Sequence, residues 1–120
     1  MPGKLTFKLQ KRDQQNSDFD WMNIDCGVIR VGKVRGLIDG NSLTINSINI
    51  FPEFENCGYA RETIDMFKTT FYTVIADRVR PTAIGFWEKM GFVDMGKGNY
   101  AYHKGELRSA TPDEGAGGDR

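Results

Sequence analysis

The first half of the chain alternates apolar and polar residues in short runs, a pattern typical of β-strands. Residues 5–9 alternate in this way and predict a first strand. Residues 26–51 are rich in β-branched side chains and are interrupted at Gly32 and at the turn sequence Asp39-Gly40-Asn41. We therefore expect three antiparallel strands, over residues 26–31, 33–39 and 42–51.

The last of these strands breaks its own alternation. Leu43 and Ile45 are followed by Ile48 and Ile50, so the apolar face shifts by one residue along the strand. Since one extra residue in a strand produces such a shift, we expect a β-bulge near Asn46-Ser47.

Further along, the apolar residues change to helical spacing in two places. A helix over residues 58–71 is predicted by apolar positions at intervals of three and four: Ala60, Ile64, Phe67 and Phe71. A second helix over residues 81–90 is predicted by Pro81 at its start, Gly91 at its end and an apolar face at Ala83, Trp87 and Met90.

The remaining segments complete the expected order of elements. Residues 71–76 are mostly apolar and predict a strand buried on both faces, and residues 92–95 and 99–104 predict a closing hairpin. Residues 10–25 are polar with a few embedded aromatics and fit either a loop or a short irregular helix. Residues 105–120 have little aliphatic content and predict a disordered tail after a single domain of residues 1–104.

Charge and cysteine content exclude several classes of protein. The chain has 16 Lys plus Arg and 16 Asp plus Glu, seven of each sign in residues 1–60 and nine of each in residues 61–120. A non-specific binder of nucleic acid or of an anionic membrane needs a cationic excess, so we expect neither partner.

Cys26, Cys57 and the single His103 lack metal-ligand spacing, so we expect no metal site and no disulfide framework. The N-terminus is polar where a signal peptide is apolar, which makes the cytoplasm the expected location.

The junction at residues 50–61 carries the clearest candidate chemistry. A strand ends at Pro52, a short loop follows, and a helix begins at Gly58. The first N–H groups of a helix have no intrahelical partner and lie at the positive end of the helix dipole, so they can hold a phosphate. By pattern alone, a plain tight turn explains the same residues. No P-loop or dinucleotide-binding motif is present, which argues against a nucleotide kinase or a dinucleotide enzyme.

The segment IFPEFENCGYARETIDMF, followed by a strand and then TAIGFWEKMGF, resembles the GNAT superfamily of acyl-CoA-dependent N-acyltransferases. The family's first motif is a strand, Pro-Glu and [Q/R]-x-x-G-x-[G/A]; its second is a helix reading A-I-x-F-Y-x-K-x-G-F. The resemblance implies an α+β fold in three layers. Its central sheet is mixed and mostly antiparallel, with a splayed, bulged fourth strand and two main helices.

The resemblance also implies acetyl-CoA, or another acyl-CoA, as cofactor. The pyrophosphate would lie on the backbone amides of residues 56–61, and the pantetheine would pair with the bulged strand. Arg80 stands where many members have an Asn that touches the cofactor, and its guanidinium can reach a phosphate. The implied cofactor-binding residues are Ile48, Asn49, Ile50, Asn56, Cys57, Gly58, Tyr59, Ala60, Arg61, Arg80 and Trp87.

Several positions depart from the family pattern. Glu55 replaces the usual Gln or Arg and puts a carboxylate beside the expected pyrophosphate. Trp87 replaces the Tyr that protonates the leaving thiolate in many members, and an indole N–H cannot act as a general acid near neutral pH. The other phenols that could supply a proton are Tyr59, Tyr100 and Tyr102.

The usual Glu base of the fifth strand is also replaced, here by Ile75. Asp77 lies two residues on, on the same face of the strand, and is the candidate catalytic base; a base acting through water is the alternative. Asp77, Arg78 and Arg80 fit a solvated loop equally well. We expect an N-acetyltransferase that transfers acetyl from acetyl-CoA to a primary amine of a small molecule or peptide, by direct attack in a ternary complex. A homodimer is compatible with the resemblance. The alternative is a catalytically silent acyl-CoA-binding or protein-interaction module.

Overall fold

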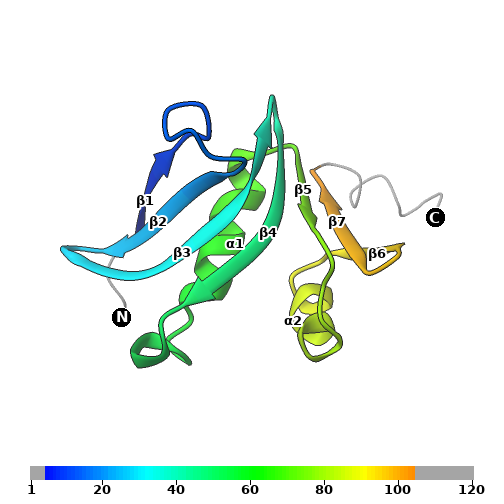
Figure 1. The fold of residues 1–120 in the computed structure, drawn as a ribbon. Helices are drawn as coiled ribbons and strands as arrows, with labels where there is room; N and C mark the ends of the chain where they lie inside the picture. Colours follow the sequence, from blue (N-terminus) through cyan, green and yellow to red (C-terminus); the bar gives the residue numbers. More distant parts are fainter. Residues whose placement is uncertain (1–4, 105–120) are drawn as a thin grey trace.

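The sheet of this protein has seven strands in the order β1-β2-β3-β4-β5-β7-β6 (Figure 1). The computed structural model describes residues 5–104. All neighbouring strands are antiparallel except β4 and β5, which are parallel. The strands are β1 Leu5–Gln10, β2 Asp20–Cys26, β3 Ile29–Asp39, β4 Ser42–Ile50, β5 Thr73–Ala76, β6 Val93–Gly96 and β7 Asn99–His103. The expected mixed, mostly antiparallel α+β fold is confirmed.

Both predicted helices are confirmed. α1 spans Tyr59–Thr70, and α2 spans Ile84–Lys89 after a 3₁₀ turn at Pro81–Ala83. The closing hairpin is confirmed as β6 and β7. The expectation that residues 71–76 are buried on both faces is wrong, because only Val74 and Ala76 of β5 are buried and the alternate residues, Thr73 and Ile75, are half-exposed.

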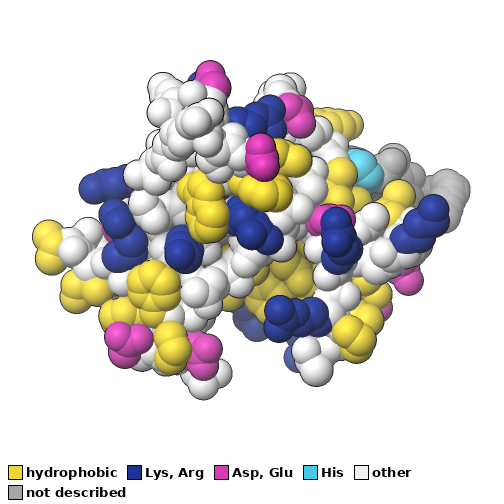
Figure 2. All heavy atoms as spheres, in the orientation of Figure 1, with side chains coloured by type: hydrophobic (Ala, Val, Ile, Leu, Met, Phe, Trp, Pro, Cys, Tyr) yellow, Lys and Arg dark blue, Asp and Glu magenta, His cyan; other side chains and the backbone are white. Residues whose placement is uncertain are grey.

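The helix α1 covers one face of β1 to β4, and no helix within residues 5–104 covers their opposite face. Figure 1 shows α1 behind β3 and β4. Phe67 of α1 packs on Phe7 of β1 with ring centroids 5.7 Å apart. The side chains of Ile24, Val34 and Ile64 are fully buried between the two layers. We call the opposite side of β2, β3 and β4 the open face; it bears Trp21, Lys33, Arg35, Ser47 and Asn49, which pair across the strands. Figure 2 shows Lys and Arg side chains spread over this side of the molecule.

The bulge predicted from the slipped alternation is present in β4. Arg35 pairs with Ser47 and the next residue, Gly36, pairs with Ile45, so Asn46 is the extra residue. β4 pairs with β5 only over Ser42–Ile45. Beyond Asn46 the two strands splay apart, which confirms the splayed, bulged fourth strand.

The predicted boundaries of the second and third strands are wrong. β3 runs continuously through Gly32, and β2 lies in residues 20–26, where the sequence pattern left a loop and a helix open. The chain turns at Gly27, which has a φ of 63°. Gly32 serves another purpose: a Cβ there would lie 2.5 Å from the backbone oxygen of Asn49, so the glycine lets β3 and β4 approach closely.

Replacing Gly36 with alanine should destabilise the fold. A Cβ at this buried position would collide with the backbone oxygen of Thr44, which cannot move without breaking the sheet. We expect a loss of about 2–3 kcal/mol and a Tm lower by roughly 10 °C, measured by thermal unfolding. The matched control is Gly85→Ala, because no atom lies within 4 Å of the added Cβ in α2 and helix propensity favours alanine. An unchanged Tm for Gly36→Ala would contradict the close packing of β3 on β4.

One prediction concerns a segment outside the described residues. The expected tail, residues 105–120, lies outside them, as do residues 1–4. Within residues 5–104, no helix has the length and apolar content needed to cross a bilayer. In the same range, no three His, Cys, Asp or Glu side chains lie close enough to hold a metal ion.

Candidate functional site

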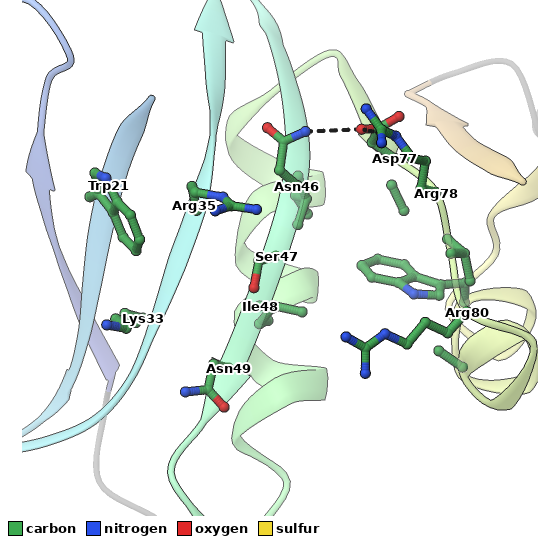
Figure 3. A pocket seen from close by; sticks show the side chains of 15 residues that line it. Trp21, Lys33, Arg35, Asn46, Ser47, Ile48, Asn49, Asp77, Arg78 and Arg80 are labelled. Carbon is green, nitrogen blue, oxygen red and sulfur yellow. Dashed lines mark hydrogen bonds and ion pairs between the residues drawn. The ribbon is translucent and has the colours of Figure 1, made fainter. Parts of the chain in front are cut away.

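A cavity of about 440 Å³ opens where β4 and β5 splay apart. Its walls come from β2, β3, β4, the end of β5 and α2, and Figure 3 shows the polar side chains around it. The cavity exists because the bulge at Asn46 ends the pairing of β4 with β5. The edge of β4 that faces β5 therefore has unpaired backbone groups over residues 46–50, next to a space large enough for a ligand.

Five of the predicted site residues line this cavity: Ile48, Asn49, Asp77, Arg80 and Trp87. Ile48 and Asn49 pair with β3 on one side and lie at the unpaired edge of β4 on the other. Figure 3 shows the guanidinium of Arg80 extending from the α2 side toward β4. The sequence analysis assigned to one site residues that lie up to 39 positions apart, and all five line the cavity that the splay of β4 and β5 opens.

Asp77 is held at the apex of the splay. Its backbone N–H donates a hydrogen bond to the backbone oxygen of Ile45 at 2.9 Å. Among the described residues, this is the last backbone hydrogen bond between the β4 and β5 segments before they splay apart. Asn46 Nδ2 donates to Asp77 Oδ2 at 3.0 Å (Figure 3). The other atom of this amide, Asn46 Oδ1, is buried without a hydrogen-bond partner among the described residues. An orphaned buried oxygen beside a carboxylate is suited to accept a hydrogen bond from a ligand N–H.

The charge of this cavity differs from that of the whole chain. Four cationic side chains line it and Asp77 is the one acidic side chain among the described lining residues; the cations are Lys33, Arg35, Arg78 and Arg80. Arg78 Nε lies 3.6 Å from Asp77 Oδ2 and is largely exposed. A chain of zero net charge therefore forms a locally positive cavity, which total composition does not reveal.

A second cavity, of about 410 Å³, lies at the start of α1. Its predicted lining residues are Ile50, Asn56, Gly58, Tyr59, Ala60 and Arg61. Gly58 precedes the helix with a φ of 83°, and no side chain caps the first turn. The first N–H groups of α1 therefore have no side-chain capping partner among the described residues. Phe86 lines this cavity and Trp87 the larger one, so both cavities adjoin the same turn of α2.

Two loop residues differ in their fit to this cavity. Cys57 is exposed and does not line either cavity; its Sγ lies 3.7 Å from the backbone oxygen of Glu55. A direct side-chain role for Cys57 therefore gains no support, although its backbone stays in the loop. Glu55 lines the second cavity, so the carboxylate that departs from the family pattern does lie beside the predicted phosphate site.

Trp87 is a packing residue as well as a cavity wall. It is buried, and its ring packs edge-on against Phe92 with centroids 4.9 Å apart. The tyrosines considered as proton donors do not replace it: no tyrosine is among the described residues that line the larger cavity. A hydrogen bond to Cys26 raises the pKa of Tyr59, and burial raises the pKa of Tyr100, which makes both phenols poorer acids.

The lining residues that were not predicted as site residues include Trp21, Lys33, Arg35 and Asn46. The first three lie on strands whose pairing brings them to the cavity from 40 or more positions before Asp77. For Asn46 a signal existed, because the slipped alternation places it in the bulge. That pattern located the backbone irregularity but not the hydrogen bond across the splay.

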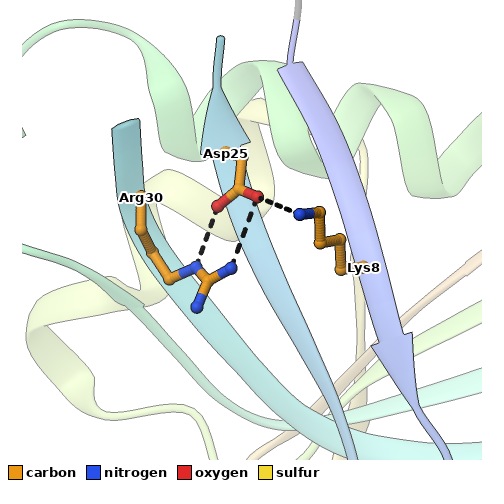
Figure 4. A network of polar contacts seen from close by, with 3 residues as sticks. All are labelled: Lys8, Asp25 and Arg30. Carbon is orange, nitrogen blue, oxygen red and sulfur yellow. Dashed lines mark hydrogen bonds and ion pairs between the residues drawn. The ribbon is translucent and has the colours of Figure 1, made fainter. Parts of the chain in front are cut away.

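Other cations on the open face are already neutralised. Figure 4 shows Asp25 between Arg30 and Lys8, with Arg30 Nε 2.8 Å and Lys8 Nζ 3.7 Å from its carboxylate oxygens. The hydrogen bond from Arg30 lowers the pKa of Asp25 below 3.8, its ordinary value. This network joins β1, β2 and β3 and is separate from the cavity.

The Asp25 network should make stability depend on pH. Folding lowers the pKa of Asp25 below its ordinary value of 3.8. The ionised carboxylate therefore stabilises the native state at any pH above 3.8, and this contribution is lost as the pH falls through the pKa of the folded state. Asp25→Asn should therefore have a lower Tm than the parent at neutral pH, with a gap that narrows below about pH 4. Asp18→Asn, at an exposed position of the β1–β2 loop, is the control. A gap that stays constant from pH 7 to pH 3 would contradict the ionic contribution.

The fold matches solved acetyltransferase structures. An N-acetyltransferase from Bacillus subtilis, YlbP in complex with coenzyme A, aligns over 69% of this chain and 66% of its own, with a TM-score of 0.55 and 20% identity. An acetyltransferase of the GNAT family from Bacteroides thetaiotaomicron aligns over 76% of this chain and 64% of its own, with a TM-score of 0.58 and 14% identity. The chain has the GNAT fold. It spans about two thirds of the length of these two relatives. No family model and no curated protein matches its sequence.

A further GNAT-fold neighbour affects the expected partners. AtaT complexed with acetyl-methionyl-tRNAfMet aligns over 88% of this chain and 98% of its own, with a TM-score of 0.64 and 8% identity. The charge balance led us to expect no nucleic-acid partner. That exclusion is not supported, because a chain of this fold is found with tRNA and because the cations here gather at one cavity.

Proposed function

We propose that this protein is an N-acetyltransferase that uses acetyl-CoA, or another acyl-CoA, and transfers the acyl group to a primary amine. The observation that carries the proposal is the cavity at the splay of β4 and β5, with Asp77 and the orphaned oxygen of Asn46 at its apex. Support also comes from the GNAT fold and from the coenzyme A bound by one of its solved neighbours.

The described residues fit such a cofactor at two places. The first-turn N–H groups of α1, after Gly58, have no capping side chain and would hold the pyrophosphate. The unpaired edge of β4 at residues 48–50 would pair with the pantetheine amides, as an edge strand pairs with an added strand. Arg80 extends into the space between them and would add a positive charge near a phosphate. Glu55 opposes this binding and sets a limit on affinity.

When bound, acetyl-CoA supplies a thioester whose carbonyl carbon is open to attack by an amine. Asn46 Oδ1 would accept a hydrogen bond from the attacking amine and orient its lone pair. Asp77 would accept the proton that the nitrogen loses as the C–N bond forms and the C–S bond breaks, directly or through one water. Arg78 and Arg80 make this end of the cavity positive, which would favour departure of an anionic thiolate. This electrostatic support would take the place of the missing tyrosine acid.

Titration with CoA and acetyl-CoA, followed by assay of acyl transfer to a panel of amines, tests the proposal. Saturable binding and release of free CoA thiol in the presence of an amine would support it. No heat on titration with millimolar CoA would overturn the cofactor assignment.

The second candidate is a GNAT-fold module that binds acyl-CoA without turnover. Trp87 favours this module, because it packs edge-on against Phe92 at the position where the family usually has its tyrosine acid. The described residues that line the larger cavity also include no tyrosine. Binding of CoA without acyl transfer to any amine or lysine peptide would favour this module.

A further inference from the structure

The wall of the larger cavity on the open face carries two cations that are stacked on aromatic rings. Lys33 Nζ lies 5.3 Å from the ring centroid of Trp21, and Arg35 Cζ lies 4.8 Å from that of Phe19. Cation–π contacts of this kind restrain the side chains and leave their N–H groups free to bind. We call Lys33 and Arg35, with these two rings, the cation pair.

The cation pair has no internal counterion. No carboxylate within residues 5–104 lies at ion-pair distance from either cation, in contrast to Lys8 and Arg30, which share Asp25 (Figure 4). Arg35 Nε is moreover buried without a hydrogen-bond partner among the described residues. A buried, unpaired guanidinium N–H is costly unless a ligand satisfies it. Two uncompensated cations and one orphaned donor indicate that the missing group is an anion.

The position of the cation pair assigns this anion to the amine substrate. The cofactor residues proposed above lie at α1, at the β4 edge and at Arg80, on the other walls of the cavity. Lys33 and Arg35 alternate on β3, so their Cα atoms are about 6.6 Å apart on one face, and they pair with Asn49 and Ser47 of β4. Figure 3 shows the Arg35 guanidinium directed toward Asn46 and the Lys33 amine on the Trp21 side. The planar guanidinium of Arg35 suits a phosphate or carboxylate, and the flexible Lys33 side chain can turn to the same anion.

We infer that the acyl acceptor is a primary amine that carries an anionic group, a phosphate or a carboxylate, bound by Lys33 and Arg35. Its amine then lies at Asn46 Oδ1 and Asp77. This inference rests on the proposed acetyltransferase function and adds the class of substrate. Besides Arg80, which is assigned to the cofactor, the described cavity lining holds two cations without a carboxylate partner, which suits one anionic group on a small amine. An extended polyanion would need a longer row of unpaired Lys and Arg.

A series of amines matched in length and differing in charge tests the inference. With acetyl-CoA as donor, O-phosphoethanolamine and β-alanine should have kcat/KM values about tenfold or more above that of ethanolamine, because a charged hydrogen-bond pair is lost with the neutral amine. 1,2-Diaminoethane should be the poorest substrate. The comparison of phosphate with carboxylate identifies which anion the site prefers.

Variants of the cation pair separate binding from chemistry. Lys33→Gln with Arg35→Gln should raise KM for the anionic amines about tenfold or more and abolish most of their preference over ethanolamine. Arg35→Lys keeps the charge and should restore most of the preference, so the test survives if Arg35→Gln unfolds. Lys89→Gln removes a charge at an exposed position of α2 that lines neither cavity and should change nothing.

A binding measurement without turnover distinguishes the two proposals. Titration of O-phosphoethanolamine into CoA-saturated protein should show saturable binding that the double variant loses. Failure to bind CoA at all would overturn the proposed function, whereas CoA binding with equal use of neutral and anionic amines would overturn only the inference. Saturable binding of a single-stranded oligonucleotide in place of the small amines would overturn the small-substrate assignment. A dimer that dissociates in the double variant would show instead that the cation pair contacts a second copy of the chain.

Discussion

Replacing Asp77 with alanine should lower kcat for acyl transfer by about a hundredfold or more, the usual contribution of a positioned general base. Affinity for CoA should stay within about twofold, because the proposed phosphate and pantetheine contacts lie elsewhere. Steady-state kinetics with the best amine, together with titration by CoA, measure the two effects separately.

Asp77→Asn is the sharper variant of the same test. It keeps the shape and an oxygen that can accept the hydrogen bond from Asn46 Nδ2, but it cannot take up a proton. If Asp77 only holds the splay together, the asparagine variant should retain activity and the alanine variant should lose it. Equal and large losses in both would identify the carboxylate as the proton acceptor. Activity unchanged in both would transfer this role to water.

Replacing Gly58 with valine should weaken CoA binding about tenfold or more. The residue has a φ of 83°, where a β-branched side chain costs roughly 1–3 kcal/mol, while no atom lies within 4 Å of the added Cβ. The effect therefore comes from backbone conformation rather than from a clash inside the protein. A valine that relaxes toward negative φ turns the first N–H groups of α1 away from the phosphate. Isothermal titration with CoA measures the change.

Gly40→Val is the matched control for this prediction. Gly40 also has a positive φ, 59°, with no atom within 4 Å of an added Cβ, but it lies in the β3–β4 turn and lines neither of the two cavities described above. It should lose a similar amount of stability and keep its CoA affinity. If Gly58→Val folds and binds CoA as tightly as the parent, the pyrophosphate must lie elsewhere.

The elements with strong periodicity were predictable, and those without it were not. Helical spacing located α1 to within a residue or two, and the slipped alternation located the bulge at Asn46. The second strand was missed because residues 10–25 contain few apolar positions. Hydrogen bonding to β1 on one side and β3 on the other makes β2 a strand, and the local sequence does not record this pairing. Gly32 was interpreted as the end of a strand. A glycine that lets two strands approach closely cannot be distinguished in sequence from a glycine that forms a turn.

The candidate site was predictable where it follows one local motif. The loop before α1 and the residues of α2 lie within short segments whose resemblance to the GNAT superfamily is direct. The hydrogen bond between Asn46 and Asp77 joins residues 31 positions apart, and no local pattern records it. The cation pair was missed for the same reason, since Lys33 and Arg35 read as exposed positions of an ordinary strand.

The sequence by itself determined the two helices, the bulge in β4 and the glycine turn before α1, because each depends on residues that are close along the chain. Only the tertiary structure decided where the charge lies. The chain has equal numbers of acidic and basic residues, yet sheet pairing buries Asp25 between Lys8 and Arg30 and brings Lys33, Arg35, Arg78 and Arg80 to one cavity. Electrostatic interactions fall with distance in space and not along the chain, so a neutral sequence can form a positive site.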